Sequence, residues 1–203
     1  MSTFSIVPAP DTGLWRVHRR GASPLLQGQI VQAHDPLARP TLHATNSPIA
    51  ALGMSLLPFQ PSRRLVGKVK AEWVGVIPES WFDARTLTRI IVPPGTGFID
   101  AMTLGNAYNI TSAALHGPPA ARSPVRRLLR GLAAELEGKS IGGFTYPSRF
   151  DESWRIYEIF EDQLKVDFQE ATPDVYRASI DQAMERLGMA VGPSAPARGK
   201  PPS

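Results

Sequence analysis

The chain has 203 residues, of which 42% are hydrophobic and 20% charged, and this composition is typical of a globular protein with one good core. The formal net charge is +4, and Arg198 and Lys200, in a C-terminal stretch without acidic residues, supply two of these charges. The rest of the chain, at about +2, lacks the basic footprint of a nucleic-acid-binding groove, so we expect no direct nucleic-acid partner.

Several classes of protein are excluded by residues that are missing. The sequence has no cysteine, which excludes disulfide bonds, a thiol nucleophile and sulfur-ligated zinc. No signal peptide is readable at the N-terminus, and no apolar run approaches the ~20 residues that span a bilayer. We expect a soluble cytoplasmic protein without a membrane partner, although secretion without a cleavable signal stays open.

The first part of the chain is predicted to contain an arm and two short strands. Residues 1–13 are expected to form an irregular N-terminal arm, and residues 14–19 a strand. A loop rich in Gly, Pro and Asp leads to a second strand at 41–45.

A short helix is predicted directly after this second strand. Ser47 is a suitable N-cap, Pro48 suits the first helical position, and Pro58 ends the helix. Gly53 lies in the middle, where glycine costs about 1 kcal/mol relative to alanine and therefore calls for a reason.

The central part of the chain is predicted to contain two further strands. Residues 66–74 alternate between charged and apolar side chains, and residues 86–92 are β-branched and end at two prolines. Residues 95–117 give weak signals, consistent with one short helix and a loop.

The clearest helix is predicted to begin with Ser123 as N-cap and Pro124 as first residue, and to end at Gly138. Five apolar residues recur at helical spacing on one face. They are Val125, Leu128, Leu129, Leu132 and Leu136.

Three arginines, Arg126, Arg127 and Arg130, lie on the other face of this helix. We interpret them as a solvated helix surface rather than a nucleic-acid-binding patch.

Two strands, at 141–146 and 153–160, flank Ser148, and a final helix at 172–188 begins with a Thr-Pro pair. Residues 189–203 are expected to be a disordered tail. Strands and helices mix without a βαβ rhythm, which favours a single α+β domain over residues 14–188, with a mixed β core flanked by helices.

Common catalytic and metal-binding patterns are absent. The four histidines, His18, His34, His43 and His116, form no helical metal-binding pair, so no metal site is predicted. The sequence also lacks a phosphate-binding glycine loop followed by lysine, and a GxSxG nucleophile elbow.

Four polar residues at the ends of elements remain as candidates: Arg16, His43, Ser148 and Arg149. Each has a plain structural alternative. Arg16 suits a salt bridge on a strand, His43 a half-buried histidine with satisfied hydrogen bonds, and Ser148 a turn cap. Taken singly, none supports a function.

Taken in order, these residues give the chain a resemblance to a known family. The motifs are "LWRVH", "TLHATNSPIAALGM" and "GGFTYPSRFDESWRIYEIF", with the helix "PVRRLLRGLAAEL" before the last. The chain resembles the RES-domain family, the toxin component of a class of bacterial toxin–antitoxin pairs. The resemblance spans residues 14–162, and "YPSR" is its most specific part.

The resemblance implies an α+β fold similar to ADP-ribosyltransferases, and an activity that destroys NAD⁺ by breaking the nicotinamide–ribose bond, with water or phosphate as acceptor. NAD⁺ would be substrate or ligand, and no prosthetic group is implied. A helix-turn-helix antitoxin is the implied partner, and homo-oligomerisation stays open.

The resemblance also assigns site residues. The family Arg and Ser fall on Arg16 and Ser148, and the family Tyr falls on His43; these three are the expected catalytic residues. Tyr146 and Arg149 are expected to line the NAD⁺ pocket with them, through guanidinium contacts to the pyrophosphate and aromatic stacking.

The chain departs from the family pattern where the family has a helical Glu. That position falls on Gly53 or Met54, and neither carries a charge. A second family Arg has no aligned counterpart, although Arg39 is near. Glu152 and Glu158, close to "YPSR", are candidates for an acid supplied from elsewhere.

Three hypotheses therefore stay open. The first is an NAD⁺-consuming RES-type enzyme. The second is a RES-like domain with impaired catalysis that binds a nucleotide or a protein. The third is a non-enzymatic protein whose similarity reflects fold alone.

Overall fold

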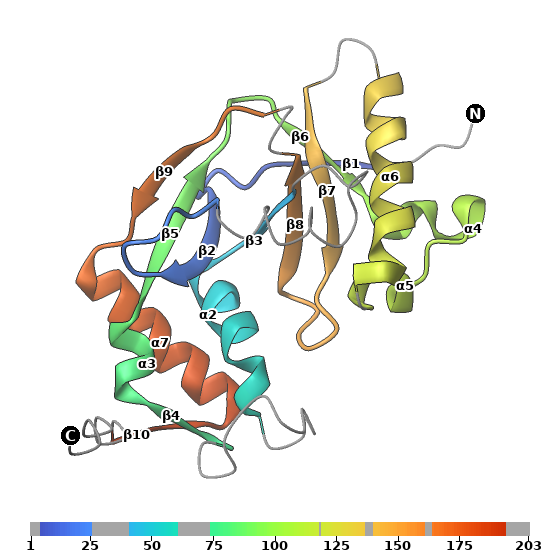
Figure 1. Ribbon diagram of the computed structural model, residues 1–203. Helices are drawn as coiled ribbons and strands as arrows, with labels where there is room; N and C mark the ends of the chain where they lie inside the picture. Colours follow the sequence, from blue (N-terminus) through green and yellow to red (C-terminus); the bar gives the residue numbers. More distant parts are fainter. Residues whose placement is uncertain are drawn as a thin grey trace, which may run out of the picture.

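The computed structural model describes residues 5–25, 41–60, 74–117, 119–136, 140–160 and 164–193. Its centre is an eight-stranded sheet in the order β1-β6-β7-β8-β3-β2-β5-β9, in which only β6 and β7 pair in parallel (Figure 1). The strands are β1 (Ile6–Pro8), β2 (Leu14–Arg19), β3 (Thr41–Thr45), β5 (Arg85–Ile91), β6 (Gly97–Asp100), β7 (Ile141–Pro147), β8 (Arg155–Phe160) and β9 (Asp167–Glu170).

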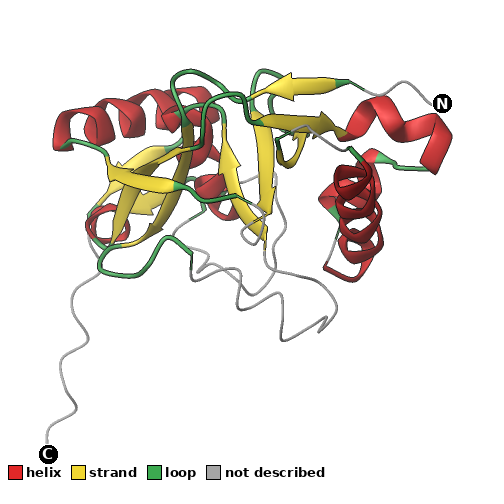
Figure 2. Cartoon of the chain, turned by 90° about the horizontal axis from the view of Figure 1, so that it is seen from above, coloured by secondary structure: helices red, strands yellow, loops and turns green. Residues whose placement is uncertain are grey.

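The helices form two groups, α4, α5 and α6 next to β7, and α2, α3 and α7 next to β2 and β5 (Figures 1 and 2). The described helices are α2 (Pro48–Leu56), α3 (Glu79–Asp83), α4 (Gly105–Tyr108), α5 (Ser112–His116), α6 (Pro119–Glu135) and α7 (Pro173–Leu187), with 3₁₀ turns η1 (Leu57–Phe59) and η3 (Ala101–Leu104). A small parallel sheet joins β4 (Val76–Pro78) and β10 (Ala190–Gly192). The single α+β domain expected from the sequence is confirmed.

The large sheet divides between β2 and β3. These two strands share one register pair, Trp15 with Thr45, whereas β2 pairs with β5 along its whole length. Strands β2, β5 and β9 therefore form one part of the sheet, and β1, β6, β7, β8 and β3 form the other.

Each group of helices packs on the sheet through its own apolar cluster, and a further cluster that includes Leu14 and Leu42 joins the two parts of the sheet. The 3₁₀ turn η3 and helices α5 and α6 pack on β7 and β8 through a cluster that includes Leu129, Phe144 and Phe160. Helices α2 and α7 pack together through Leu52 and Met184, among others, in a second cluster next to β2. The sheet therefore holds the two groups of helices in place.

Helix α2 begins as the sequence predicts. The Ser47 hydroxyl accepts a hydrogen bond from the Ala50 N–H, and Pro48 occupies the first helical turn. Gly53 has a structural reason as well. A Cβ at this position would lie 2.1 Å from the Trp154 ring, so only glycine lets that buried ring lie on the helix.

Helix α6 begins earlier than predicted. It starts at Pro119, so Ser123 is not its N-cap and Pro124 is not its first residue; Pro124 lies inside the helix. A proline there removes one backbone hydrogen bond. Burial of Val125 and Leu129 on the sheet outweighs that loss. The expected C-terminal stop, Gly138, lies outside the described residues.

Several short strands were not predicted. The expected irregular arm over 1–13 contains β1, and the expected disordered tail over 189–203 contains β10. Strand β6 lies within 95–117, where one helix and a loop were expected. Three or four residues are too few to show a periodicity, and pairing with distant strands makes them extended.

Some sequence predictions lie outside the described residues. They concern most of the strand over 66–74, Arg39, and the tail from residue 194. Within the part of the chain that the structure describes, no helix is long and apolar enough to cross a membrane.

The close packing of Gly53 on Trp154 leads to the first testable expectation. Gly53→Ala should lower the free energy of unfolding by about 1–3 kcal/mol, because the added methyl group overlaps the buried ring. Urea denaturation measures this. Gly131→Ala in α6 is the matched control: nothing lies within 4 Å of its added Cβ, and alanine should stabilise the helix by up to ~1 kcal/mol. Equal effects in the two variants would contradict the packing argument.

Candidate functional site

A buried carboxylate, Glu158, stands at the centre of the candidate site. In the sheet it lies between two strands, opposite His43 of β3 and opposite Phe144 of β7. Its side chain is 1% exposed. A charge buried this deeply must be paired and hydrogen-bonded to be tolerated.

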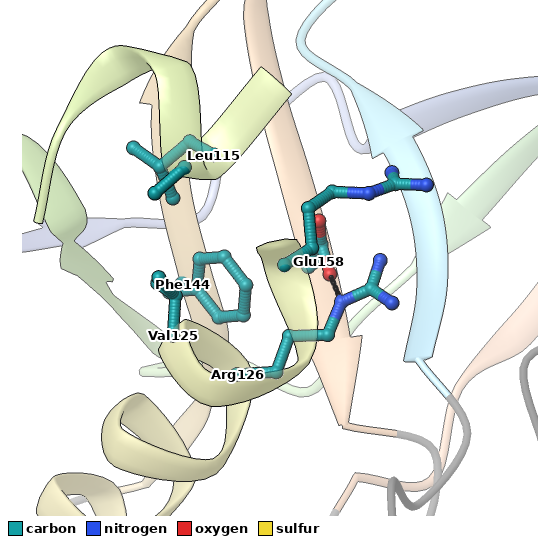
Figure 3. A pocket seen from close by; sticks show the side chains of 7 residues that line it. Leu115, Val125, Arg126, Phe144 and Glu158 are labelled. Carbon is teal, nitrogen blue, oxygen red and sulfur yellow. Dashed lines mark hydrogen bonds and ion pairs between the residues drawn. The ribbon is translucent and has the colours of Figure 1, made fainter. Parts of the chain in front are cut away.

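Four side chains surround this carboxylate. Its Oε2 accepts a hydrogen bond from Arg126 Nε at 2.5 Å (Figure 3). It also accepts one from the Thr41 hydroxyl at 3.3 Å. Its Oε1 accepts one from the Tyr146 hydroxyl at 3.0 Å and lies 3.7 Å from His43 Nε2. The sheet and α6 together therefore satisfy both carboxylate oxygens.

Glu158 is ionised in this setting. Burial on its own raises the pKa of the Glu158 carboxyl, yet the Arg126 guanidinium bonded to it and the more distant Arg122 together hold the pKa below its usual value. Burial and the Glu158 charge raise the pKa of Tyr146 well above its usual value, so its hydroxyl stays protonated and donates.

His43 is neutral and its tautomer is defined. Its Nε2 lies 2.7 Å from Arg126 Nη2, and a guanidinium only donates, so Nε2 accepts and the ring proton resides on Nδ1. Burial, together with Arg126 and opposed by Glu158, lowers the pKa of His43 to about 4. The side chain is 31% exposed, so His43 connects the buried carboxylate with the surface.

Arg16 reaches this group across the division of the sheet. It lies on β2 with 5% of its surface exposed, and its Nη1 donates to the His43 carbonyl oxygen at 3.4 Å. The structure thus brings two residues that the sequence predicted, His43 and Tyr146, next to Glu158, and places Arg16 against the His43 backbone.

Ser148 occupies a different setting. It is 2% exposed, and its Oγ accepts from the Phe150 N–H at 3.2 Å and donates to the Met54 sulfur at 3.4 Å. The first bond is a turn cap, the structural alternative noted from the sequence. Within the described residues these hydrogen bonds do not reach Glu158.

The contact with Ser148 also distinguishes the two α2 residues that align with the family Glu. Met54 faces Ser148, whereas Gly53 lies against Trp154. Neither residue supplies a charge at this position: Met54 offers Ser148 an uncharged thioether, and Gly53 has no side chain.

Arg149 is connected to Tyr146 only through His116 in the described part of the chain. Its guanidinium stacks on the Phe150 ring at 4.8 Å, and after burial its charge is the largest influence lowering the pKa of His116. The His116 ring in turn packs edge-on against Tyr146 at 5.2 Å. Glu152, the other candidate acid, is exposed in the turn between β7 and β8.

The sequence analysis missed Arg126. The expectation of a solvated arginine face on α6 holds for exposed Arg127 but is wrong for Arg126, which is 4% exposed and ion-paired with Glu158. Arg130 stacks on the Phe160 ring at 4.3 Å. The available signal was Glu158 itself, because a lone acid in an otherwise apolar strand requires a cationic partner.

A crevice separates α6 from the sheet at this point. Arg122, Arg126 and Glu158 form its charged side, and it is too narrow to admit a water molecule. Figure 3 shows Leu115 and Phe144 on the apolar side. Among the described residues, no group of three or more His, Asp or Glu side chains could hold a metal ion.

Comparisons with known proteins give one structural match. A chain of the M. tuberculosis MbcT–MbcA toxin–antitoxin complex superposes with a TM-score of 0.55 at 13% sequence identity, covering 87% of this chain and 92% of that chain. This chain shares its fold with a component of a toxin–antitoxin complex. No protein-family model matches the sequence, and a search of curated proteins finds no match either. At this identity the likeness shows the fold alone.

The Arg126–Glu158 pair leads to an expectation about stability. Arg126→Met should lower the free energy of unfolding by about 3–5 kcal/mol, because it leaves the Glu158 charge buried without its partner. Urea denaturation of Arg126→Met and of the exposed control Arg127→Met measures the difference, and the control should change by less than about 0.5 kcal/mol. Adding Glu158→Gln to Arg126→Met should restore part of the loss. Without such a rescue, the ion-pair explanation fails.

The low pKa of His43 leads to an expectation about pH. Between about 6.5 and about 4 the unfolded chain binds a proton at this position that the folded chain does not, so stability falls as the pH falls through this window. His43→Gln should remove that part of the loss. Urea denaturation at a series of pH values tests this, and an unchanged slope in the variant would show that His43 is not held neutral.

Proposed function

We propose that the protein is a RES-like, toxin-type enzyme that binds NAD⁺ and breaks the bond between nicotinamide and ribose. The observation that carries the proposal is the ionised carboxylate of Glu158, which lies beside His43 at the position where the resemblance places the reaction. The proposal gives Glu158 the role that the helical Glu has in the family.

The cost of burying this charge supports a functional role. Replacing a buried ion pair by apolar residues of similar volume is often neutral or stabilising, so the pair contributes little to the net stability of the fold. Buried titratable groups with shifted pKa values gather at functional sites. The neighbouring side chains of β7 and β8 that pack against α6 are apolar, among them Phe144, Ile156 and Phe160, so the charged group interrupts an apolar contact between helix and sheet.

The chemistry suits a carboxylate. As the C1′–N1 bond breaks, its electron pair passes to the pyridinium nitrogen, and positive charge develops on the ribose, as in glycosyl transfer generally. A nearby carboxylate stabilises that charge. An oxygen of water or phosphate then forms the new bond to C1′ and releases its proton. Arg16 is suited to the pyrophosphate, and neutral His43 to a hydrogen bond with a ribose hydroxyl.

Access to Glu158 requires a movement. The crevice next to the carboxylate admits no water, and Arg126 covers Oε2. In the proposed reaction cycle the ligand enters from the exposed side of His43 and draws Arg126 away from the carboxylate.

The shared fold supports a partner as well. Since the matching structure is a toxin–antitoxin complex, we propose that this chain acts as a toxin in the cytoplasm and is restrained by an antitoxin of the helix-turn-helix class. This follows from the fold and from the sequence resemblance.

A second candidate function is nucleotide binding without turnover. The contact between the Ser148 hydroxyl and the Met54 sulfur favours it, because a thioether replaces the carboxylate that the family uses. Losing one transition-state contact commonly costs about 100-fold or more in rate.

Nicotinamide release from NAD⁺ tests the proposed activity. Glu158→Gln should lower kcat by about 100-fold or more while the change in melting temperature caused by NAD⁺ is kept, because the carboxylate acts mainly in the transition state. Glu152→Gln, an exposed acid near the same loop, is the matched control and should keep wild-type kcat.

Each outcome decides between the candidates. Turnover that needs Glu158 and not Glu152 supports the enzyme. NAD⁺ that raises the melting temperature of the wild type without nicotinamide release overturns the enzyme and supports the binding module. If NAD⁺ has neither effect, both proposals fail.

A further inference from the structure

Two buried guanidinium nitrogens on α6 have no acceptor among the residues that the structure describes. They are Arg126 Nη1 and Arg122 Nε. Leaving a buried donor unpaired costs about 1–3 kcal/mol, more when the group is charged, so native structures contain few of them. Arg126 is the stronger case, since its side chain is almost wholly buried and its two other guanidinium nitrogens hold Glu158 and His43.

The charges in the crevice do not balance. Arg122 and Arg126 are four residues apart on one helix and line the same crevice, where Glu158 is the single acid. Like charges at this spacing repel each other. His43 stays neutral, and Arg16 adds a further positive charge close by. The crevice therefore holds an excess of positive charge in a space with little water.

We propose that Arg122 and Arg126 form a binding site for the oxyanion of a phosphate group. Guanidinium groups bind phosphate oxygens through paired N–H donors, and a phosphate would supply acceptors to the two unpaired nitrogens and offset the excess charge. The assignment of this phosphate to the pyrophosphate of NAD⁺ rests on the proposed function. The excess positive charge of Arg122 and Arg126 favours inorganic phosphate equally.

Entry of the anion follows from the exposure of the two arginines. Arg122 is half-buried and lies at the accessible side of the crevice, whereas Arg126 lies inside it. Because the closed crevice admits no water, the anion displaces the Arg122 side chain first and then reaches Arg126. Binding of the phosphate to Arg126 therefore weakens the ion pair between Arg126 and Glu158. The Glu158 carboxylate becomes exposed in the same step.

Calorimetric titration of the full chain tests the site at constant ionic strength. Pyrophosphate, inorganic phosphate and ADP-ribose are the probes, with adenosine as the ligand that lacks a phosphate. Arg122→Gln should weaken pyrophosphate binding at least ~10-fold, since glutamine lacks the positive charge and the paired N–H donors that bind phosphate oxygens. Arg127→Gln removes the same charge from the exposed side of α6 and should bind like the wild type.

The probes separate the sources of the phosphate and the two proposals. Tighter binding of ADP-ribose than of inorganic phosphate supports a nucleotide ligand, and the reverse order supports inorganic phosphate at the same site. Equal losses in Arg122→Gln and Arg127→Gln, or no binding by the wild type, overturn the site. Arg122-dependent pyrophosphate binding without NAD⁺ cleavage leaves the site standing and rejects the enzyme. If Arg122→Gln cleaves NAD⁺ with the wild-type KM, the phosphate site is rejected and the proposed enzyme activity stands.

Discussion

The hydrogen-bonded ion pair between Arg126 and Glu158 determines the geometry and the charge state of the candidate site. A carboxylate in the interior of a sheet is tolerated only with donors on both oxygens, and α6 supplies the strongest of them. The pair therefore fixes how α6 sits on β8. It also determines the state of His43, because the guanidinium that neutralises Glu158 makes Nε2 of the imidazole an acceptor.

The backbone on the two sides of this pair differs: β7 approaches β8 closely, whereas β3 and β2 separate. Gly143 of β7 has a φ of +155°, and a Cβ there would lie 1.9 Å from the Glu158 carbonyl oxygen, so only glycine allows β7 to approach β8 at this level. On the other side, β3 meets β2 at one register pair, and Arg16 bridges the division by bonding to the His43 backbone. The site thus lies between the close contact of β7 with β8 and the division between β3 and β2.

The sequence predicts those parts of this arrangement that depend on residues close together in the chain. The Ser-Pro start of α2 and the Thr-Pro start of α7 need only neighbouring residues, and both are where the sequence placed them. Ordered motifs named Arg16, His43 and Tyr146 as site residues; the structure places them around His43 and Glu158, and their roles stay predictions. The role of Arg126 could not be found in that way, because its partner is 32 residues away and the helix pattern placed it on the solvated face. Strand β6 was missed for the same reason, since its extended conformation comes from pairing with β1 and β7.

Because Glu158 is buried on a central strand, any ligand of this site must compete with the cation that neutralises it. On α2 the uncharged thioether of Met54 faces Ser148, whereas the buried negative charge resides on Glu158 of β8. A strand in the middle of a sheet holds a side chain more rigidly than a short helix, but it also buries it, so the charge needs a permanent cation. That cation then competes with any ligand for the carboxylate. Whatever this site binds must first offer Arg126 a better partner than Glu158, and among common ligands a phosphate group has the charge and geometry to do so.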